Sequence, residues 1–427
     1  MDMNRPTICL FIAAVSWLVL APVQPVDAGD WTQFRGPGGE GHSDAKGLPT
    51  EWSEQKNVVW KVPLPGSGWS SPVLAAGKLY LTAAIAEGGK TGASVDRRLH
   101  VFCLDAKTGK TIWDRDVFEQ EGRKAPNIHK KNSHASPTPV IEGDRIYVHF
   151  GHQGTACLDT GGQVLWRNRE IVYSPVHGGG GSPVIAGDKL IFTCDGKEKP
   201  FVAALSKEDG TLAWKFMRDT GAKKKFSFAT PLVIEVGGKL QVIAPGSGGV
   251  SALDPDSGQQ IWFADYGEGY SVIPRPVYGH GMVFVSSGYD RPVAMAIRSD
   301  GKGDVTKTHI VWETDRRAPN TPSMLLVGDE LYMTSDGGVT TCLDAKSGDE
   351  YWSERTGGGM SASPVYAEGR IYLQDEEGLG TVLEAGTEFE ELARNRLDGR
   401  TLASYALDDG AIYIRSETHL YRIGEKS

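Results

Sequence analysis

The hydrophobic pattern of the chain repeats one short unit eight times. In each copy an apolar segment leads into a glycine turn, and a segment of alternating apolar and polar residues follows, as in "SPVIAGDKLIF" from Ser182. An alternation with a period of two residues on both sides of a tight turn predicts a β-hairpin. The hairpins begin at Ser71, Thr138, Ser182, Thr230, Arg275, Ser323, Ser363 and Ser404, at intervals of 40 to 48 residues after a first interval of 67.

A second unit follows most of these hairpins and ends in tryptophan. "LDAKTGKTIW" at 104–113 and "LDAKSGDEYW" at 343–352 are its most similar copies, and further copies end at Trp166, Trp214 and Trp262. A longer copy ends at Trp312. Asp and Ser side chains bond to the backbone of a tight turn, and Gly accepts its left-handed position. Each copy therefore predicts a strand, a turn and a second strand.

A hairpin followed by a strand–turn–strand makes a four-stranded antiparallel unit. Eight such units at this period predict an all-β protein, an eight-bladed β-propeller. The eighth unit lacks its fourth strand because the chain ends soon after "THLYRI", whereas "NVVWKVPL" at 57–64 is a spare strand. We expect this N-terminal strand to complete the last blade and close the ring, which removes exposed sheet edges. The propeller then spans 57–427, after an N-terminal strap over 29–56.

One tryptophan recurs near the end of almost every unit. A buried Trp removes roughly 200 Å² from water and brings its indole N–H to a backbone acceptor. We therefore expect these residues to dock one blade on the next rather than to stack on a cofactor; they are Trp60, Trp113, Trp166, Trp214, Trp262, Trp312 and Trp352. The seventh unit departs from the pattern, because "TVLEAGTEFEELARNRL" contains no Trp.

The first 28 residues have the pattern of an export signal. Arg5 gives a weakly positive start, an apolar run follows at 8–20, and Val26-Asp27-Ala28 is a small-x-small cleavage site. The apolar run is too short to span a bilayer. We therefore expect an exported protein, periplasmic or extracellular, that is soluble after cleavage near Ala28 and has no membrane span.

The composition of the chain argues against one class of partner. The 45 Lys and Arg against 54 Asp and Glu give a formal net charge of -9, and no basic run occurs. Because nucleic-acid phosphates require clusters of Lys and Arg, a nucleic-acid partner is not expected. The four cysteines after the signal (Cys103, Cys157, Cys194 and Cys342) do not cluster, and three share the context of a buried strand. We expect a monomer with small buried cysteines.

The recurring Asp-x-x-[Ser/Thr]-Gly-x-x-x-Trp motif in eight units resembles the PQQ-type β-propeller repeat family. The resemblance covers about residues 57–423. That family includes quinoprotein alcohol dehydrogenases and a non-catalytic propeller lipoprotein of outer-membrane protein assembly. The leader "WTQFRGPGGEGHS" at 31–43 looks like the opening of exported propellers of this type.

The resemblance implies definite parts for a dehydrogenase. Its members have two adjacent bridged cysteines, a calcium held by Glu, Asn and Asp, and a second Asp as base. Calcium polarises the quinone carbonyl, and the base removes the alcohol proton. This sequence has no Cys-Cys pair, no matching ligand cluster and none of the long insertions. We therefore predict no catalytic residues, no metal site and no cofactor. The alternative is a PQQ- and calcium-dependent oxidoreductase of alcohols or sugars.

Function is expected where the repeat is broken. Seven hairpins begin with a small hydroxyl residue, and the fifth begins with Arg275. An Arg there could reach into the axial funnel and bind a carboxylate or phosphate. The other interpretation is a structural ion pair with Asp265 or Asp290. Further ligand-binding candidates at the neighbouring hairpin ends are Tyr270, Tyr289, Asp290 and Arg291.

An insertion before the second hairpin adds Asn132 and His134, and the strand after it adds His149. Four close His side chains would suggest a transition metal, but His149 and His152 fall on opposite faces of a strand. A solvated loop is the simpler interpretation. The sequence favours a binding or scaffold propeller for a protein, a glycan or a small anionic ligand at the channel mouth.

Overall fold

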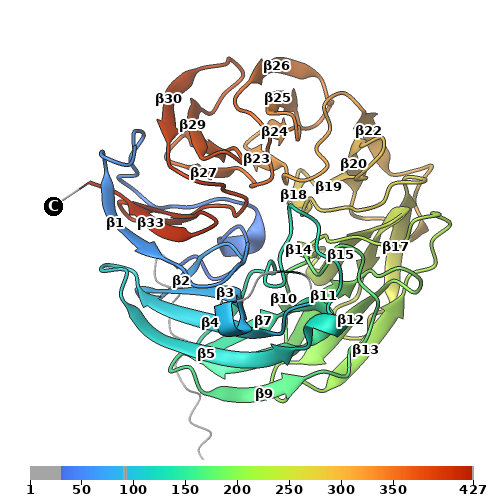
Figure 1. Ribbon diagram of the computed structural model, residues 1–427. Helices are drawn as coiled ribbons and strands as arrows, with labels where there is room; N and C mark the ends of the chain where they lie inside the picture. The colour runs from blue at the N-terminus through green and yellow to red at the C-terminus, as the bar shows by residue number, and fades with distance from the viewer. Residues whose placement is uncertain (1–29, 90–91, 93, 426–427) are drawn as a thin grey trace, which may run out of the picture.

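The computed structural model describes residues 30–89, 92 and 94–425, so the expected export signal lies outside the described residues. Eight separate antiparallel sheets are arranged radially around a central axis (Figure 1). The predicted eight-bladed propeller is confirmed. Hydrophobic cores lie between neighbouring blades; one of them, for example, joins Val73 and Val101 to Ile146 and Leu158 of the next blade. In the described part of the chain, no helix is long and apolar enough to cross a membrane.

The first four blades follow one another in sequence. Blade 1 contains β2 (Val73–Ala75), β3 (Lys78–Ala86), β4 (Arg97–Asp105) and β5 (Thr111–Gln120). Blade 2 contains β6 (Val140–Glu142), β7 (Arg145–His149), β8 (Thr155–Asp159) and β9 (Val164–Asn168). Blade 3 contains β10 (Val184–Ala186), β11 (Lys189–Cys194), β12 (Phe201–Ser206) and β13 (Leu212–Met217). Blade 4 contains β14 (Leu232–Val236), β15 (Lys239–Gly246), β16 (Gly249–Leu253) and β17 (Gln260–Asp265).

The last four blades complete the ring. Blade 5 contains β18 (Val277–Gly279), β19 (Met282–Ser286), β20 (Ala294–Arg298) and β22 (Ile310–Thr314). Blade 6 contains β23 (Leu325–Val327), β24 (Glu330–Thr334), β25 (Val339–Asp344) and β26 (Glu350–Arg355). Blade 7 contains β27 (Val365–Ala367), β28 (Arg370–Gln374), β29 (Leu379–Glu384) and β30 (Glu391–Arg396). Blade 8 contains β31 (Ala406–Asp408), β32 (Ala411–Arg415), β33 (His419–Ile423) and the N-terminal β1 (Val58–Pro63).

Short 3-10 turns lie outside the blades: η1 (Pro37–Gly39), η2 (Glu87–Gly89), η3 (Gly122–Lys124) and η4 (Gly151–Gln153).

The ring closes as predicted. β1 pairs antiparallel with β33, with Val62 opposite Leu420, so strands from the two ends of the chain lie side by side in blade 8 (Figure 1). One strand was not expected from the repeat. In the long turn of blade 5, β21 (Gly303–Asp304) pairs in parallel with β17 and covers the outer edge of blade 4.

The recurring tryptophans join neighbouring blades through one hydrogen bond. Trp113 donates its indole N–H to the carbonyl of Thr160 in the turn of the next blade, at 3.1 Å. Six of the seven make this contact; the others are Trp60 with Ala106, Trp166 with Lys207, Trp214 with Pro255, Trp312 with Ala345 and Trp352 with Gly386. Each indole thus bonds to the last turn of the following blade.

The departures from this contact have structural reasons. Trp262 bonds to Gln241 of its own blade, because the longer turn of blade 5 carries β21 instead of the short Asp/Gly turn. In blade 7, Ala393 occupies the position of the Trp, opposite Val382. Blade 8 has no last turn to dock on, since its fourth strand comes from the N-terminus.

Three cysteines serve this docking as small partners. Cys103, Cys157 and Cys342 lie directly opposite Trp113, Trp166 and Trp352 in the sheet, and Ala takes the same place in blades 3, 4 and 5. All four described cysteines are free and buried. Burial raises the pKa of Cys103 to about 11, so this thiol stays protonated and packs as a small apolar group.

Replacement of Trp312 tests the docking contact. Trp312→Phe keeps an aromatic ring on the turn at Gly348 but loses the 2.9 Å hydrogen bond to Ala345, so we expect a loss of about 1 kcal/mol in the free energy of unfolding. Trp312→Ala also loses the packing and should cost about 3 kcal/mol. Val311→Ala, at the exposed neighbouring position, is the control and should change stability by less than about 0.5 kcal/mol in urea unfolding. Equal losses for all three variants would contradict the docking role.

Candidate functional site

A ring of hydrogen bonds surrounds the axis where the innermost strands begin. In seven of the eight blades, the hydroxyl of the first hairpin residue accepts the backbone N–H of its counterpart in the preceding blade, at 2.9 to 3.1 Å. Seven such bonds run around the axis: Ser71 to Thr138, Thr138 to Ser182, Ser182 to Thr230, Arg275 to Ser323, Ser323 to Ser363, Ser363 to Ser404 and Ser404 to Ser71. The repeated hydroxyls are therefore structural acceptors as well as lining groups.

Arg275 interrupts this ring of hydroxyls, but its side chain does not point into the axial funnel as the sequence predicts. Its side chain is 1% exposed, and its guanidinium donates to the Pro231 carbonyl (3.0 Å), the Phe34 carbonyl (2.6 Å) and Oε1 of Gln33 (3.1 Å). The predicted reach into the open funnel is therefore corrected, and so are the alternative ion pairs with Asp265 or Asp290. Arg275 instead binds the N-terminal leader.

The leader closes one end of the axial channel. It bonds to innermost strands or hairpin turns of six blades: Trp31 with Leu74, Thr32 with Ile141, Glu40 with Tyr278, His42 with Leu326, Ser43 with Tyr366 and Lys46 with Gly410. Gly39 lies against the Arg275 guanidinium with a φ of +78°, and a Cβ there would be 2.1 Å from Nη1. Only glycine fits this approach, which explains the "GPGG" of the leader.

Three charges are buried together beneath the leader. Burial, with the neighbouring Arg275 as a further cause, lowers the pKa of Arg35 to about 9. Burial also lowers the pKa of Arg275 to about 10 and raises the pKa of Glu40 above its usual range. Glu40 is the carboxylate that faces both guanidiniums, and it also accepts the N–H of Tyr278 at 2.5 Å. The cluster secures the leader and faces no open cavity.

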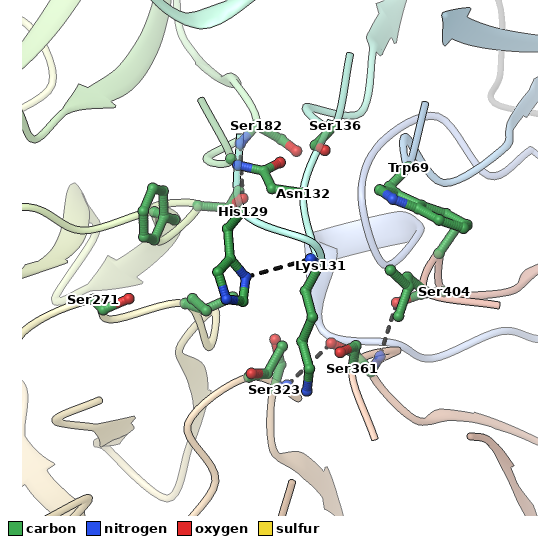
Figure 2. Close-up of a pocket in the computed structure, with 18 of the residues that line it drawn as sticks. Trp69, His129, Lys131, Asn132, Ser136, Ser182, Ser271, Ser323, Ser361 and Ser404 are labelled. Carbon is green, nitrogen blue, oxygen red and sulfur yellow. Dashed lines mark hydrogen bonds between the residues drawn. The ribbon is translucent and has the colours of Figure 1, made fainter. Parts of the chain in front are cut away.

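The other end of the axis opens into a cavity of about 290 Å³. Its floor includes Phe34 of the leader, its waist is the hydroxyl ring, and its rim consists of the loops that enter the innermost strands. Figure 2 shows Lys131 extending across it between Ser323 and Ser361. Among the described residues that line the cavity there is no Asp and no Glu.

Aromatic side chains form one wall of the cavity. Phe226 packs edge-on against Tyr270 (centroids 5.4 Å apart) and against His177 (5.6 Å), and Phe228 lies 6.0 Å from Phe226. Lys224 donates to the Tyr270 hydroxyl at 2.7 Å, and this hydroxyl donates to Asp290 at 3.0 Å. These contacts hold the wall upright at the rim.

An ion pair crosses the mouth. Lys131, from the loop before blade 2, reaches Glu376 after β28 of blade 7, with Nζ 2.6 Å from Oε1. Glu376 also accepts the Ser361 hydroxyl at 2.6 Å, and Arg400 adds favourable charge. Despite partial burial, these contacts hold the pKa of Glu376 below its usual range, so the carboxylate is ionised at neutral pH.

The structure brings some of the predicted site residues together and separates others. Tyr270, Tyr289 and Asn132 line the cavity, and Tyr289 donates its backbone N–H to Tyr270 at 2.8 Å. Asp290 lies beside them at the rim, and Arg291 is exposed outside the lining.

Two histidines lie away from the cavity, which corrects their assignment to it. His149 is buried in blade 2, where Nδ1 lies 2.8 Å from the Thr155 hydroxyl and the ring is 4.2 Å from that of Phe192. Burial, with His152 as a further cause, lowers the pKa of His149 to about 3, and burial lowers the pKa of His134 to about 4. Both are neutral at pH 7. The residues described here contain no cluster of three or more His, Cys, Asp or Glu with the geometry of a metal site.

Sequence reasoning missed most of the cavity wall. Trp69, Phe226, Phe228 and His177 lie in loops that precede the hairpins, where the repeat is weakest, and Lys131 belongs to the insertion before the second hairpin, for which the sequence favours a solvated loop. A signal was present nonetheless. Each of these residues stands a few positions before the recurring [Ser/Thr]-Pro, so the same blade alignment places them at one end of the axis.

The cavity does not fit a calcium-bound quinone. Calcium takes six to eight oxygen ligands, usually with several carboxylates, whereas this lining contains no carboxylate at all. The four cysteines are separate and free. The fold and the site together define a PQQ-type eight-bladed propeller in which the described cavity lining contains no carboxylate.

The comparisons with known proteins agree with this class. The family described as outer membrane protein assembly factor BamB matches residues 57–198, 97–323 and 304–414. The chain belongs to this family of PQQ-like propeller repeats. It is 25% identical over 350 residues to outer membrane protein assembly factor BamB of Yersinia pestis, covering 77% of this chain and 82% of that protein. The same-named protein of Shewanella oneidensis is 23% identical, with 56% of this chain and 63% of the relative covered.

Solved structures share the fold. BamB from Moraxella catarrhalis superposes with a TM-score of 0.58 at 13% identity, over 86% of this chain and 99% of that one. A europium-containing methanol dehydrogenase superposes with a TM-score of 0.53 at 11% identity, over 92% and 91%. At such identities these likenesses describe architecture only.

Arg275 provides a test of the leader contact. We expect Arg275→Ala to lower the free energy of unfolding by about 3 kcal/mol, because three buried hydrogen bonds to charged nitrogen are lost. Residues 30–56 should become cleavable in limited proteolysis. Arg275→Ser should cost less than Arg275→Ala, since a hydroxyl there restores an acceptor for the Thr230 amide. Unchanged melting with a protected leader would refute this role.

Buried His149 predicts a dependence of stability on pH. Its pKa is about 3 in the folded protein and about 6.5 in the unfolded chain, so the unfolded chain binds more protons between these values. Stability should therefore fall as pH drops below 6.5, by up to about 1.4 kcal/mol per pH unit from this group. His149→Phe keeps the ring contact with Phe192 and should flatten the curve from pH 6.5 to 4.5 in urea titrations. Parallel curves for the two proteins would show that His149 does not contribute.

Proposed function

We propose that this protein is an exported, non-catalytic scaffold that binds a protein partner during assembly of the outer membrane. The name of its relatives, outer membrane protein assembly factor, supports this role, as does the family to which the chain belongs. The observation that carries the non-catalytic part is the cavity lining, which offers seven structural hydroxyls and aromatic rings but no carboxylate to hold calcium.

The partner surface is proposed to be the loop-built end of the axis. The leader occupies the opposite end, where it bonds to six blades. At the open end, loops of different blades present Tyr270, Tyr289 and Trp69 around the cavity. Aromatic side chains with a polar tip are enriched at protein interfaces, because they contribute large contact areas at low entropic cost. A glycan at the same mouth is the alternative partner.

Deletion of the gene in the native host tests the assembly role. We expect less folded outer-membrane barrel protein in the envelope fraction, measured as the heat-modifiable band in gel electrophoresis. Tyr289→Asp places a charge at the mouth and should fail to restore assembly. Val311→Asp, on the exposed outer strand β22 of blade 5, is the matched control and should restore assembly. Unchanged barrel assembly after deletion would remove the proposed role.

A second measurement tests the oxidoreductase alternative. The purified protein with added PQQ and calcium should show no dye-linked oxidation of alcohols or sugars. Turnover above that of a boiled control would contradict a non-catalytic scaffold.

A further inference from the structure

We propose that the hydroxyl ring and Lys131 form a binding site for the oxyanion of a small organic acid, a carboxylate or a phosphate monoester, whose apolar body lies against the aromatic wall. This site is separate from the protein-binding role of the rim and stands if that role fails. Four features of the cavity support this binding site.

The first feature is the state of the seven ring hydroxyls. Each accepts one backbone N–H, and within the described residues none of them donates its own O–H to another protein group. All seven line the cavity. A hydroxyl that accepts a hydrogen bond becomes a better donor, since chains of hydrogen bonds polarise one another. The waist of the cavity is therefore a circle of O–H donors that converge on the axis.

The second feature is the charge of the lining. Lys131 is its one Lys, Arg, Asp or Glu residue, and the two lining histidines, His129 and His177, add no negative charge. A ring of donors beside an ammonium group, with no lining carboxylate to repel a ligand, favours an acceptor-rich anion over a cation. This holds although the whole chain carries a formal net charge of -9.

The third feature is that Lys131 can exchange its ion-pair partner, Glu376, for a ligand. Its ion pair with Glu376 spans the cavity mouth at 2.6 Å. If the ammonium turns to a ligand, Glu376 keeps the Ser361 hydroxyl and the favourable charge of Arg400. The ammonium exchanges one anionic partner for another, and the Glu376 carboxylate keeps a hydrogen bond and a nearby positive charge.

The fourth feature is the wall above the ring. Phe226, Phe228 and Tyr270 present an apolar surface within the same cavity, next to the donors. A volume of about 290 Å³ accommodates a ring-sized body but not a folded chain. The ligand class is thus a small amphipathic acid rather than inorganic phosphate alone.

Calorimetric titration of the purified chain tests the proposal at constant ionic strength. The probes are phenyl phosphate, phenylacetate, inorganic phosphate and the neutral benzyl alcohol. We expect phenyl phosphate or phenylacetate to bind at least tenfold more tightly than benzyl alcohol and than inorganic phosphate. Which of the two binds more tightly distinguishes a phosphate site from a carboxylate site. Equal binding of the neutral and anionic probes would overturn the proposal and leave an apolar pocket.

Two matched pairs of variants locate the site. Lys131→Met should weaken binding of the anionic probe about tenfold, whereas Lys130→Met, with the same loss of charge outside the lining, should change it less than about twofold. Thr138→Val removes a ring hydroxyl at constant shape and should weaken binding about tenfold, whereas Thr138→Ser should not. The Lys131 pair does not touch the ring, so it decides the question even if Thr138→Val fails to fold. Wild-type affinity in Lys131→Met would refute the site.

Discussion

The structure depends on the hydrogen bonds between blades around the axis. Eight short innermost strands converge there, and their first backbone amides cannot be paired within their own sheets. A buried amide without a partner costs about 1 to 3 kcal/mol, so seven of the eight blades supply a hydroxyl to the amide of the blade before them. A side chain that both points to the axis and accepts a neighbour's N–H must be short. This explains why Ser or Thr begins seven of the eight hairpins, and why the blades are in register at the centre.

Two further contacts act outward from this ring. The indoles fix the outer strands, since each of six donates to the last turn of the next blade. β1 closes the circle by pairing with β33, which joins the start of the propeller to its end. The hydroxyl ring thus constrains the inner strands, whereas the tryptophans and the closing strand, which itself carries Trp60, constrain the outer strands. Arg275 is the one first hairpin residue without a hydroxyl. Its guanidinium instead binds the leader to the centre of the propeller.

The fold could be predicted from the sequence because its signals are local and repeated. Hairpin turns, Asp/Gly turns and Trp recur in register, so eight copies corroborate one another. The site could be predicted only in part. Tyr270 and Tyr289, the candidates at the hairpin ends, line one cavity together with Asn132 of the insertion, whereas the direction of Arg275 depends on contacts with residues more than 200 positions away. The repeat pattern of the sequence contains no information about such a long-range contact. The irregular residue in a repeat was identified correctly as special, but sequence alone could not distinguish a ligand contact from a contact with the leader.

The two ends of the axis therefore differ for a physical reason. At one end the leader bonds to six blades and covers the cluster of Arg35, Glu40 and Arg275. At the other end the loops before the hairpins leave a cavity, which the ring hydroxyls line. A circular repeat would otherwise offer two similar openings. Closure of one end by the leader makes Phe34 a floor, turns the channel into a blind cavity, and confines any ligand to the face that carries the aromatic wall and Lys131 (Figure 2).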